Sequence, residues 1–154
     1  MAVESWIDAI AKLWRISDGK GGTLRSFAVY ERAEFPEALP QAPCVLTYTL
    51  DARMDYSLGG PCIDLWTGVS EFHLTTDIAK HNYPAIMLFF ARIKHAAAAS
   101  MKLGGLVDHF LLRTDEPSIR GPVVMKYGEE AEHLGLIVNW TVKENTTGAF
   151  TPGA

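Results

Sequence analysis

The chain has 154 residues and a mass of 17.0 kDa, which is the size of a single compact domain. Hydrophobic residues make up 48% and charged residues 21% of it, an ordinary globular composition that excludes an intrinsically disordered protein. The formal net charge is −4, whereas proteins that bind nucleic acid carry a surplus of basic residues, so a nucleic-acid-binding protein is excluded as well.

The first predicted element is an amphipathic helix at residues 4–15. Its apolar side chains recur with the spacing of one helical face: Trp6, Ile7, Ile10, Leu13 and Trp14. A glycine-rich run at residues 17–22 ends this helix, and a short β-like run follows at residues 27–30. Because Glu4 stands where a secretory signal needs a base, we expect a soluble protein that stays inside the cell where it is made.

Two strands follow in the middle of the chain. Residues 44–50 alternate apolar and polar side chains, which predicts a strand. Residues 51–61 are polar and contain glycine, so we expect a loop or an extended hairpin arm there. The second strand, residues 63–75, is long enough to bend at Gly68. Cys44 and Cys62 show no CxxC spacing, and we expect both to be free thiols.

The main predicted helix begins after Asn82, which can cap it, and runs to about Lys102. Pro84 suits its first turn, and glycines 104 and 105 end it. Its expected buried stripe consists of Ile86, Phe89, Phe90, Ile93, Ala97 and Met101. The longest apolar stretch of the chain, residues 83–90, is far too short to span a bilayer, so we expect no membrane partner.

Three further strands are predicted at residues 106–113, 121–127 and 134–144, with a charged hairpin loop at residues 128–133. Strands joined by hairpins beside one long helix predict an α+β fold. In this fold a mostly antiparallel sheet packs against the long helix and the N-terminal helix. We expect one domain over residues 1–144 and a flexible C-terminal tail over residues 145–154.

Few residues offer chemistry. His73, Asp77 and His81 are spaced four apart, as metal ligands on one helix would be, but they fall on a strand end and a loop rather than on one helix. Cys44 with a distant histidine has the ingredients of a thiol hydrolase, although its alternating β pattern is typical of a core residue. We therefore predict no catalytic, cofactor-binding or metal-binding residues and a protein that is not an enzyme.

The second strand carries large apolar residues on both faces, among them Trp66, Phe72 and Leu74. A sheet covered on one side only should alternate cleanly, so we predict that these three residues lie in the core or in a subunit interface. The segment before that strand mixes charges with apolar anchors, as segments that order on a partner do. It is a candidate partner-contact arm, with Arg53, Met54, Asp55, Tyr56 and Leu58 as its contact residues.

Three stretches carry a resemblance to a known family. They are the proline-marked start of the first strand at residues 35–36 and 43–46, the long strand from Trp66 to Leu74, and the last strand ending at residues 139–142. With the order helix, strand, strand, helix and three strands, residues 4–144 resemble the tail terminator (tail completion) proteins of long-tailed bacteriophages, the lambda-type minor tail protein family.

This resemblance implies a virion structural protein, assembled in the host cytoplasm, that forms a hexameric ring. The ring would cap the tail tube, end its growth and join it to the head-side connector, with DNA only passing through the lumen. The family brings no catalytic residue and no cofactor. Two alternatives stay open: another neck or head–tail connector protein of the virion, and a small α+β enzyme or ligand-binding domain that uses His73, His81 or Cys44.

Overall fold

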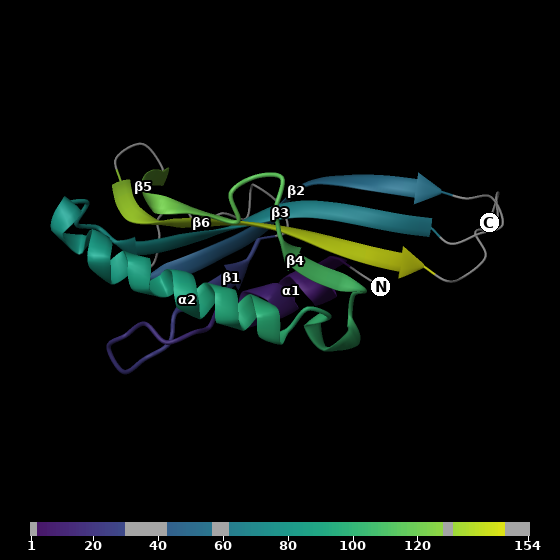
Figure 1. Ribbon diagram of the computed structural model, residues 1–154, viewed down its shortest axis with the longest axis horizontal. Coiled ribbons are helices and arrows are strands. Elements are labelled where there is room, and N and C mark those ends of the chain that lie inside the picture. The colour runs from purple at the N-terminus through teal and green to yellow at the C-terminus, as the bar shows by residue number, and fades with distance from the viewer. Residues whose placement is uncertain (1–2, 30–42, 57–61, 128–130, 147–154) are drawn as a thin grey trace.

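The computed structural model of the chain describes residues 3–29, 43–56, 62–127 and 131–146 (Figure 1). Two α-helices, six strands and two short 3-10 helices, η2 (Lys80–Asn82) and η3 (Leu103–Gly105), make up this part of the chain. In order, the α-helices and strands are α1 (Val3–Leu13), β1 (Arg25–Ala28), β2 (Cys44–Tyr56), β3 (Cys62–Thr75), α2 (Tyr83–Ala99), β4 (His109–Leu112), β5 (Ile119–Tyr127) and β6 (Ala131–Thr146). No helix in the described ranges has the length and apolar character needed to cross a membrane.

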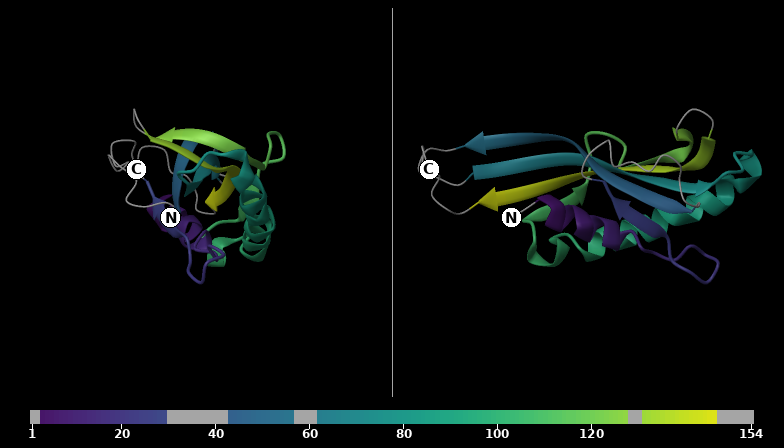
Figure 2. Two further views of the ribbon diagram at one scale, coloured as in Figure 1. Left: turned by 90° about the vertical axis from the view of Figure 1, so that its left-hand side faces the viewer. Right: turned by 180° about the vertical axis from the view of Figure 1, so that it is seen from behind.

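The six strands form one sheet in the order β1-β2-β3-β6-β4, and β5 pairs with another stretch of β6. Every pair is antiparallel except β1 with β2, which run parallel with Arg25 beside Cys44. Both helices lie against the same face of the sheet (Figures 1 and 2). We call this face the helix side and the opposite one the outer face.

The α+β class predicted from the sequence is wrong. Strands make up 49% of the described residues and helices 28%, so this part of the chain is mostly β. Its sheet is mixed because β1 pairs parallel with β2, while the other four strand pairs are antiparallel as expected. The mixed character comes from the short run near residue 27, which joins the sheet edge as β1. A parallel pair needs a connection of about a dozen residues or more, and residues 29–43 provide that length.

The strands are also longer than the sequence indicates. Residues 51–56, predicted as a loop or hairpin arm, continue β2 and pair with residues 62–67 of β3. Asn145 and Thr146, predicted to begin a flexible tail, are the last residues of β6, so the boundary at residue 144 is wrong. Residues 147–154, the rest of the predicted tail, and Leu58 lie outside the described residues. The polar residues in these strand ends are tolerated because each strand has one face or edge exposed to solvent.

Two details of the main helix also differ from the prediction. Asn82 occupies the N-cap position, but its side chain makes no cap hydrogen bond and instead donates to the carbonyl of Asp77 at 3.0 Å. Met101, expected in the buried stripe, lies beyond the helix and is exposed. Helix α2 therefore ends at Ala99, one turn earlier than the apolar spacing predicts.

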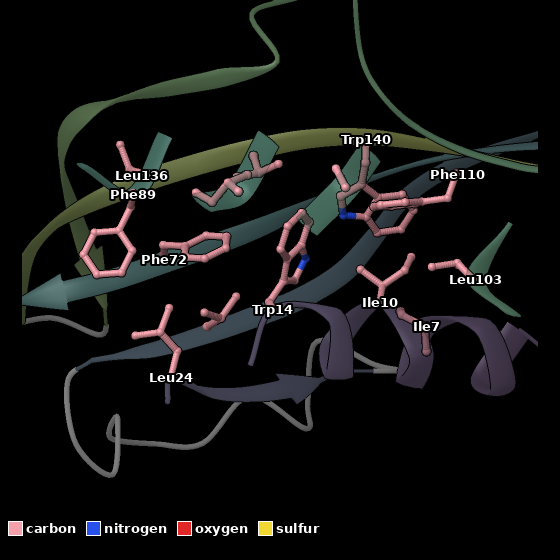
Figure 3. Close-up of a cluster of buried hydrophobic side chains, with 14 of the residues drawn as sticks. Ile7, Ile10, Trp14, Leu24, Phe72, Phe89, Leu103, Phe110, Leu136 and Trp140 are labelled. Atoms are coloured by element: carbon pink, nitrogen blue, oxygen red, sulfur yellow. The ribbon is translucent and has the colours of Figure 1, made fainter. Parts of the chain in front are cut away.

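Aromatic side chains dominate the core on the helix side (Figure 3). Trp6, Trp14 and Trp140 are fully buried. Trp14 makes an edge-to-face contact with Phe72, with ring centroids 5.5 Å apart, and Trp6 makes another with Trp140 at 5.9 Å. Such contacts add about 0.5–1.5 kcal/mol each beyond the burial of apolar area. Trp6 in α1 therefore packs against β6, and Trp14, the residue just after α1, packs against β3.

One hydroxyl group organises this core. Ser70 Oγ accepts a hydrogen bond from the indole of Trp14 at 2.8 Å and another from the indole of Trp140 at 3.1 Å. It also lies 2.9 Å from Thr47 Oγ1. Because a hydroxyl oxygen has two acceptor sites and one hydrogen, Ser70 must donate its own hydrogen to Thr47. Every hydrogen-bonding site of this buried serine is then used.

Gly68 is the place where the sheet makes room for the largest of these side chains. A Cβ atom at position 68 would lie 2.3 Å from the ring of Trp140 and 2.7 Å from the carbonyl oxygen of Tyr48. Only glycine allows the indole to lie flat on β3 there. The bend expected at this glycine is instead a bulge in the neighbouring strand, between Thr49 and Asp51.

We expect Ser70→Ala to lower the free energy of unfolding by about 2–4 kcal/mol, because it leaves two buried indole N–H groups without an acceptor. Urea denaturation followed by circular dichroism measures this change. Ser5→Ala, on the exposed side of α1, is the matched control and should change stability by less than about 0.5 kcal/mol. Equal effects of the two substitutions would show that the Ser70 hydroxyl does not hold the core.

Candidate functional site

Strands β2, β3 and β6 continue as a three-stranded projection whose tip lies past both helices (Figure 1, right). We call this projection the arm; it consists of residues 50–56, 62–67 and 141–146. Strand β4 borders only its base, where His109 pairs with Lys143. The arm is therefore a part of the sheet that contributes little to the core and is available to a partner.

The predicted contact residues lie on the β2 strand of the arm. Arg53, Met54 and Asp55 are all exposed. Arg53 lies beside Leu65 of β3, and Asp55 lies beside Ile63. Tyr56 is the last residue of β2. The structure thus groups these residues on one exposed strand, and their role in partner contact stays a prediction.

The three residues predicted for the core or an interface have different positions. Phe72 is fully buried between the sheet and α1, so it belongs to the core. Leu74 is partly buried and packs against the same core. Trp66 is half-buried at the base of the arm, with its ring centroid 5.6 Å from that of Trp6, and its indole N–H is buried without a hydrogen-bond partner. Of the three, Trp66 lies nearest to a surface that a partner could cover.

Acidic side chains gather on the helix side of the arm. Asp64 and Glu144 are directly opposite each other on β3 and β6, and like charges in that position destabilise a sheet. Burial raises the pKa of Glu144, the nearby Trp6 indole works against that rise, and the charges of Asp64 and Asp108 add to it. This end of the sheet therefore carries a carboxylate that is costly to ionise.

A polar chain crosses the outer face of the sheet. The Tyr48 hydroxyl donates to one carboxylate oxygen of Glu71, and the other oxygen lies 3.2 Å from His73 Nε2. His73 Nδ1 in turn lies 3.3 Å from Nδ1 of His133. If His73 gives its Nε2 hydrogen to the carboxylate, its Nδ1 is an acceptor and His133 is the donor. Each contact of the chain is satisfied in this state, and equally when a protonated His73 donates from both ring nitrogens and a neutral His133 accepts.

The electrostatics of this chain follow from burial and neighbouring groups. Burial would raise the pKa of Glu71, but hydrogen bonds from His73 and Tyr48 and the charge of His73 outweigh it, so the pKa of Glu71 is lowered. Burial lowers the pKa of His133, and the neighbouring His73 lowers it further. The network therefore favours an ionised Glu71 beside a neutral His133. The sequence analysis did not identify Tyr48, Glu71 or His133 as members of a network. The only indication in the sequence is that Glu71 and His73 are two residues apart on one strand and therefore share a face.

The predicted metal-ligand spacing does not produce a metal site. His73 is fully buried on the outer face, whereas Asp77 and His81 are exposed and contact only each other among these three residues, at 3.4 Å. Across the described ranges no group of three or more His, Cys, Asp or Glu side chains could hold a metal ion. The structure instead pairs His73 with Cys44, directly across from it on β2.

Cys44 is unsuited to nucleophilic chemistry in this fold. Its side chain is fully buried, and burial raises the pKa of the thiol to about 11, although the charge of Arg25 opposes the rise. The thiolate is the reactive form, so a thiol with this pKa is inert at neutral pH. Cys44 and His73 are neighbours in the sheet, but they do not form an activated nucleophile.

We expect the unfolding free energy to fall as the pH is lowered from 7.5 to 5.5. The folded-state pKa of His133 lies below its ordinary value of 6.5, so the unfolded chain takes up a proton first and stability is lost below that pH. Urea titrations at pH 7.5, 6.5 and 5.5 measure the slope, and His133→Gln should flatten it. His95→Gln, exposed on α2, should leave the slope unchanged. A slope that His133→Gln does not change would contradict a neutral, buried His133.

We expect Cys44 to resist a thiol reagent in the folded protein and to react fully in urea. Mass spectrometry after alkylation at pH 8 reads each cysteine separately, with half-buried Cys62 as the internal comparison. Rapid labelling of Cys44 under native conditions would show an accessible thiolate and would reopen the thiol-enzyme alternative.

No family model matches the chain, and no curated protein matches it significantly.

Proposed function

We propose that the protein is a virion structural subunit, not an enzyme, and that it assembles with copies of itself into a ring through its exposed apolar surfaces. The observation that carries this proposal is the arm, which extends past both helices and leaves Leu50, Met54 and Leu65 exposed. Exposed apolar area is unfavourable by about 25 cal/mol for each Å² that a partner could cover. An arm of this kind gains stability when a second subunit covers it.

The specific role rests on the resemblance to tail terminator proteins of long-tailed phages. We propose that the ring is hexameric, caps the tail tube, ends tube growth and presents its other face to the head-side connector. A ring subunit needs two different surfaces that meet head to tail. The net charge of −4 suits a lumen through which DNA passes without being gripped. Assembly in the host cytoplasm and residence in the tail or neck of the virion belong to the same proposal.

The alternative of an enzyme receives less support, because Cys44 and His73, although neighbours in the sheet, are both fully buried, and His81 is exposed and pairs with Asp77 instead. A neck or connector protein of the same virion would use the same surfaces and differ only in position. Sedimentation of the protein with purified tail tubes, compared with DNA-filled heads, separates these two positions. Binding to tubes supports the terminator, and binding to heads alone supports the connector.

We expect light scattering and negative-stain images of the purified full chain to show a closed ring rather than a monomer.

Arg53→Glu should leave the melting temperature within a few degrees of the wild type, because Arg53 is exposed, and should weaken sedimentation with tail tubes. Phe72→Ala is the contrasting variant and should lose about 3–5 kcal/mol of stability. A protein that stays monomeric and ignores preformed tubes would contradict the proposal.

A further inference from the structure

We infer that the subunits of the ring contact one another head to tail, with the arm of one copy lying against the outward side of α2 of the next copy. This inference rests on the proposed function, because it assigns the two surfaces that the ring requires. It names the partner as a second copy of this chain and the contact as heterologous.

The first surface is the side of α2 that faces away from the sheet. Its residues recur at helical spacing and are all exposed: Pro84, Met87, Leu88, Ala91, Lys94, His95 and Ala98. A helix at the surface of a monomer normally shows charged and polar residues on that side. Here Leu88 is 64% exposed, the highest value among the large apolar side chains of the described residues. A helix that is apolar on both sides is typical of one that is covered on both sides.

The second surface is the arm, where Leu50 is 54% exposed, the second highest value in the same set. Leu50 is the extra residue of the bulge between Thr49 and Asp51, so the sheet pushes it out at the base of the arm. Met54 is exposed as well and lies on the helix side of the arm beside Asp64, whereas exposed Leu65 lies on the outer face. Leu50 at the base and Met54 on the helix side therefore form the apolar part of this surface. The arm is about 20 Å long and α2 about 25 Å, so the two surfaces match in length.

The charges of the two surfaces are complementary. The segment from Lys80 to Lys102 contains four Lys or Arg residues and no Asp or Glu. On the helix side of the arm, around Met54, the charged residues are the acids Asp64 and Glu144, whereas Asp51 and Asp55 on the outer face are matched by Arg53 and Lys143. Lys94 is exposed on the outward side of α2, and Asp64 is half-buried on the helix side of the arm. Opposite charges steer the two surfaces together, and like charges oppose contact of arm with arm or of helix with helix.

The arrangement within one subunit forces the contact to be head to tail. The first turns of α2 and the tip of the arm lie at opposite ends of the long axis of the molecule (Figures 1 and 2). The two surfaces cannot meet within one chain, so each copy offers its arm to one neighbour and its helix to the other. Such heterologous contacts close into a ring when the rotation between subunits permits it.

Two single substitutions and their mixture test this contact in the full-length protein. Leu88→Glu places a charge on the helix surface, and Leu50→Lys places one on the arm. Each variant alone should associate about 30-fold more weakly or worse, as measured by light scattering over a concentration series. An equimolar mixture should regain association, because each variant still carries one intact surface that fits the intact surface of the other.

The controls separate this contact from folding and from ring formation itself. Val124→Glu on β5 is exposed and lies outside both surfaces, so it should leave the ring intact. Circular dichroism verifies folding, and if either leucine variant unfolds, Lys94→Glu and Asp64→Lys replace the pair with the same expected mixing result. Rings that survive either substitution, or a mixture that stays monomeric, overturn the inference alone. A wild-type protein that stays monomeric and does not bind preformed tubes overturns the proposed function together with the inference.

Discussion

The hydroxyl of Ser70 is the constraint on which the helix side of the sheet depends. It joins an indole from the end of α1, an indole from β6 and the hydroxyl of Thr47 on β2. The N–H of a buried tryptophan usually finds an acceptor, and here one oxygen serves both Trp14 and Trp140. The positions of α1, β2 and β6 are therefore coupled through one buried residue of β3.

This compact core leaves the ends of the three longest strands with little to cover them. The tryptophans of α1 reach only as far as Trp66, and β4 reaches only Lys143 on β6. Beyond these residues the backbone groups pair with one another, so the arm keeps its strand structure while its side chains face outward. One end of the sheet thus forms the core of a stable subunit, and the other end forms a surface suited to assembly.

The outer face follows a different principle. Its buried polar residues form a chain from Tyr48 through Glu71 and His73 to His133, which links β2, β3 and β6. Buried polar groups are tolerated when each has a partner, and a full set of partners also restricts the sheet to one register. With Cys44 held as a protonated thiol beside His73, the face resembles a polar part of the core more than an open catalytic site.

The sequence by itself determined the local structure: the amphipathic pattern at Trp6 to Trp14, the alternation from Cys44 and the apolar run around Ile86 each appear as the predicted element. These signals are local because helical and strand periodicities repeat within a few residues. The sequence also indicated that residues 53–56 differ from a core strand, although it did not show that they pair with β3.

Only the tertiary structure decided the fold class, the parallel edge formed by β1, and which distant residues meet. Ser70 lies far from both of its tryptophans in the sequence, and His73 lies 60 residues from His133. No periodicity encodes such contacts, because they depend on the strand order β1-β2-β3-β6-β4 and on a register fixed by the packing of the whole sheet.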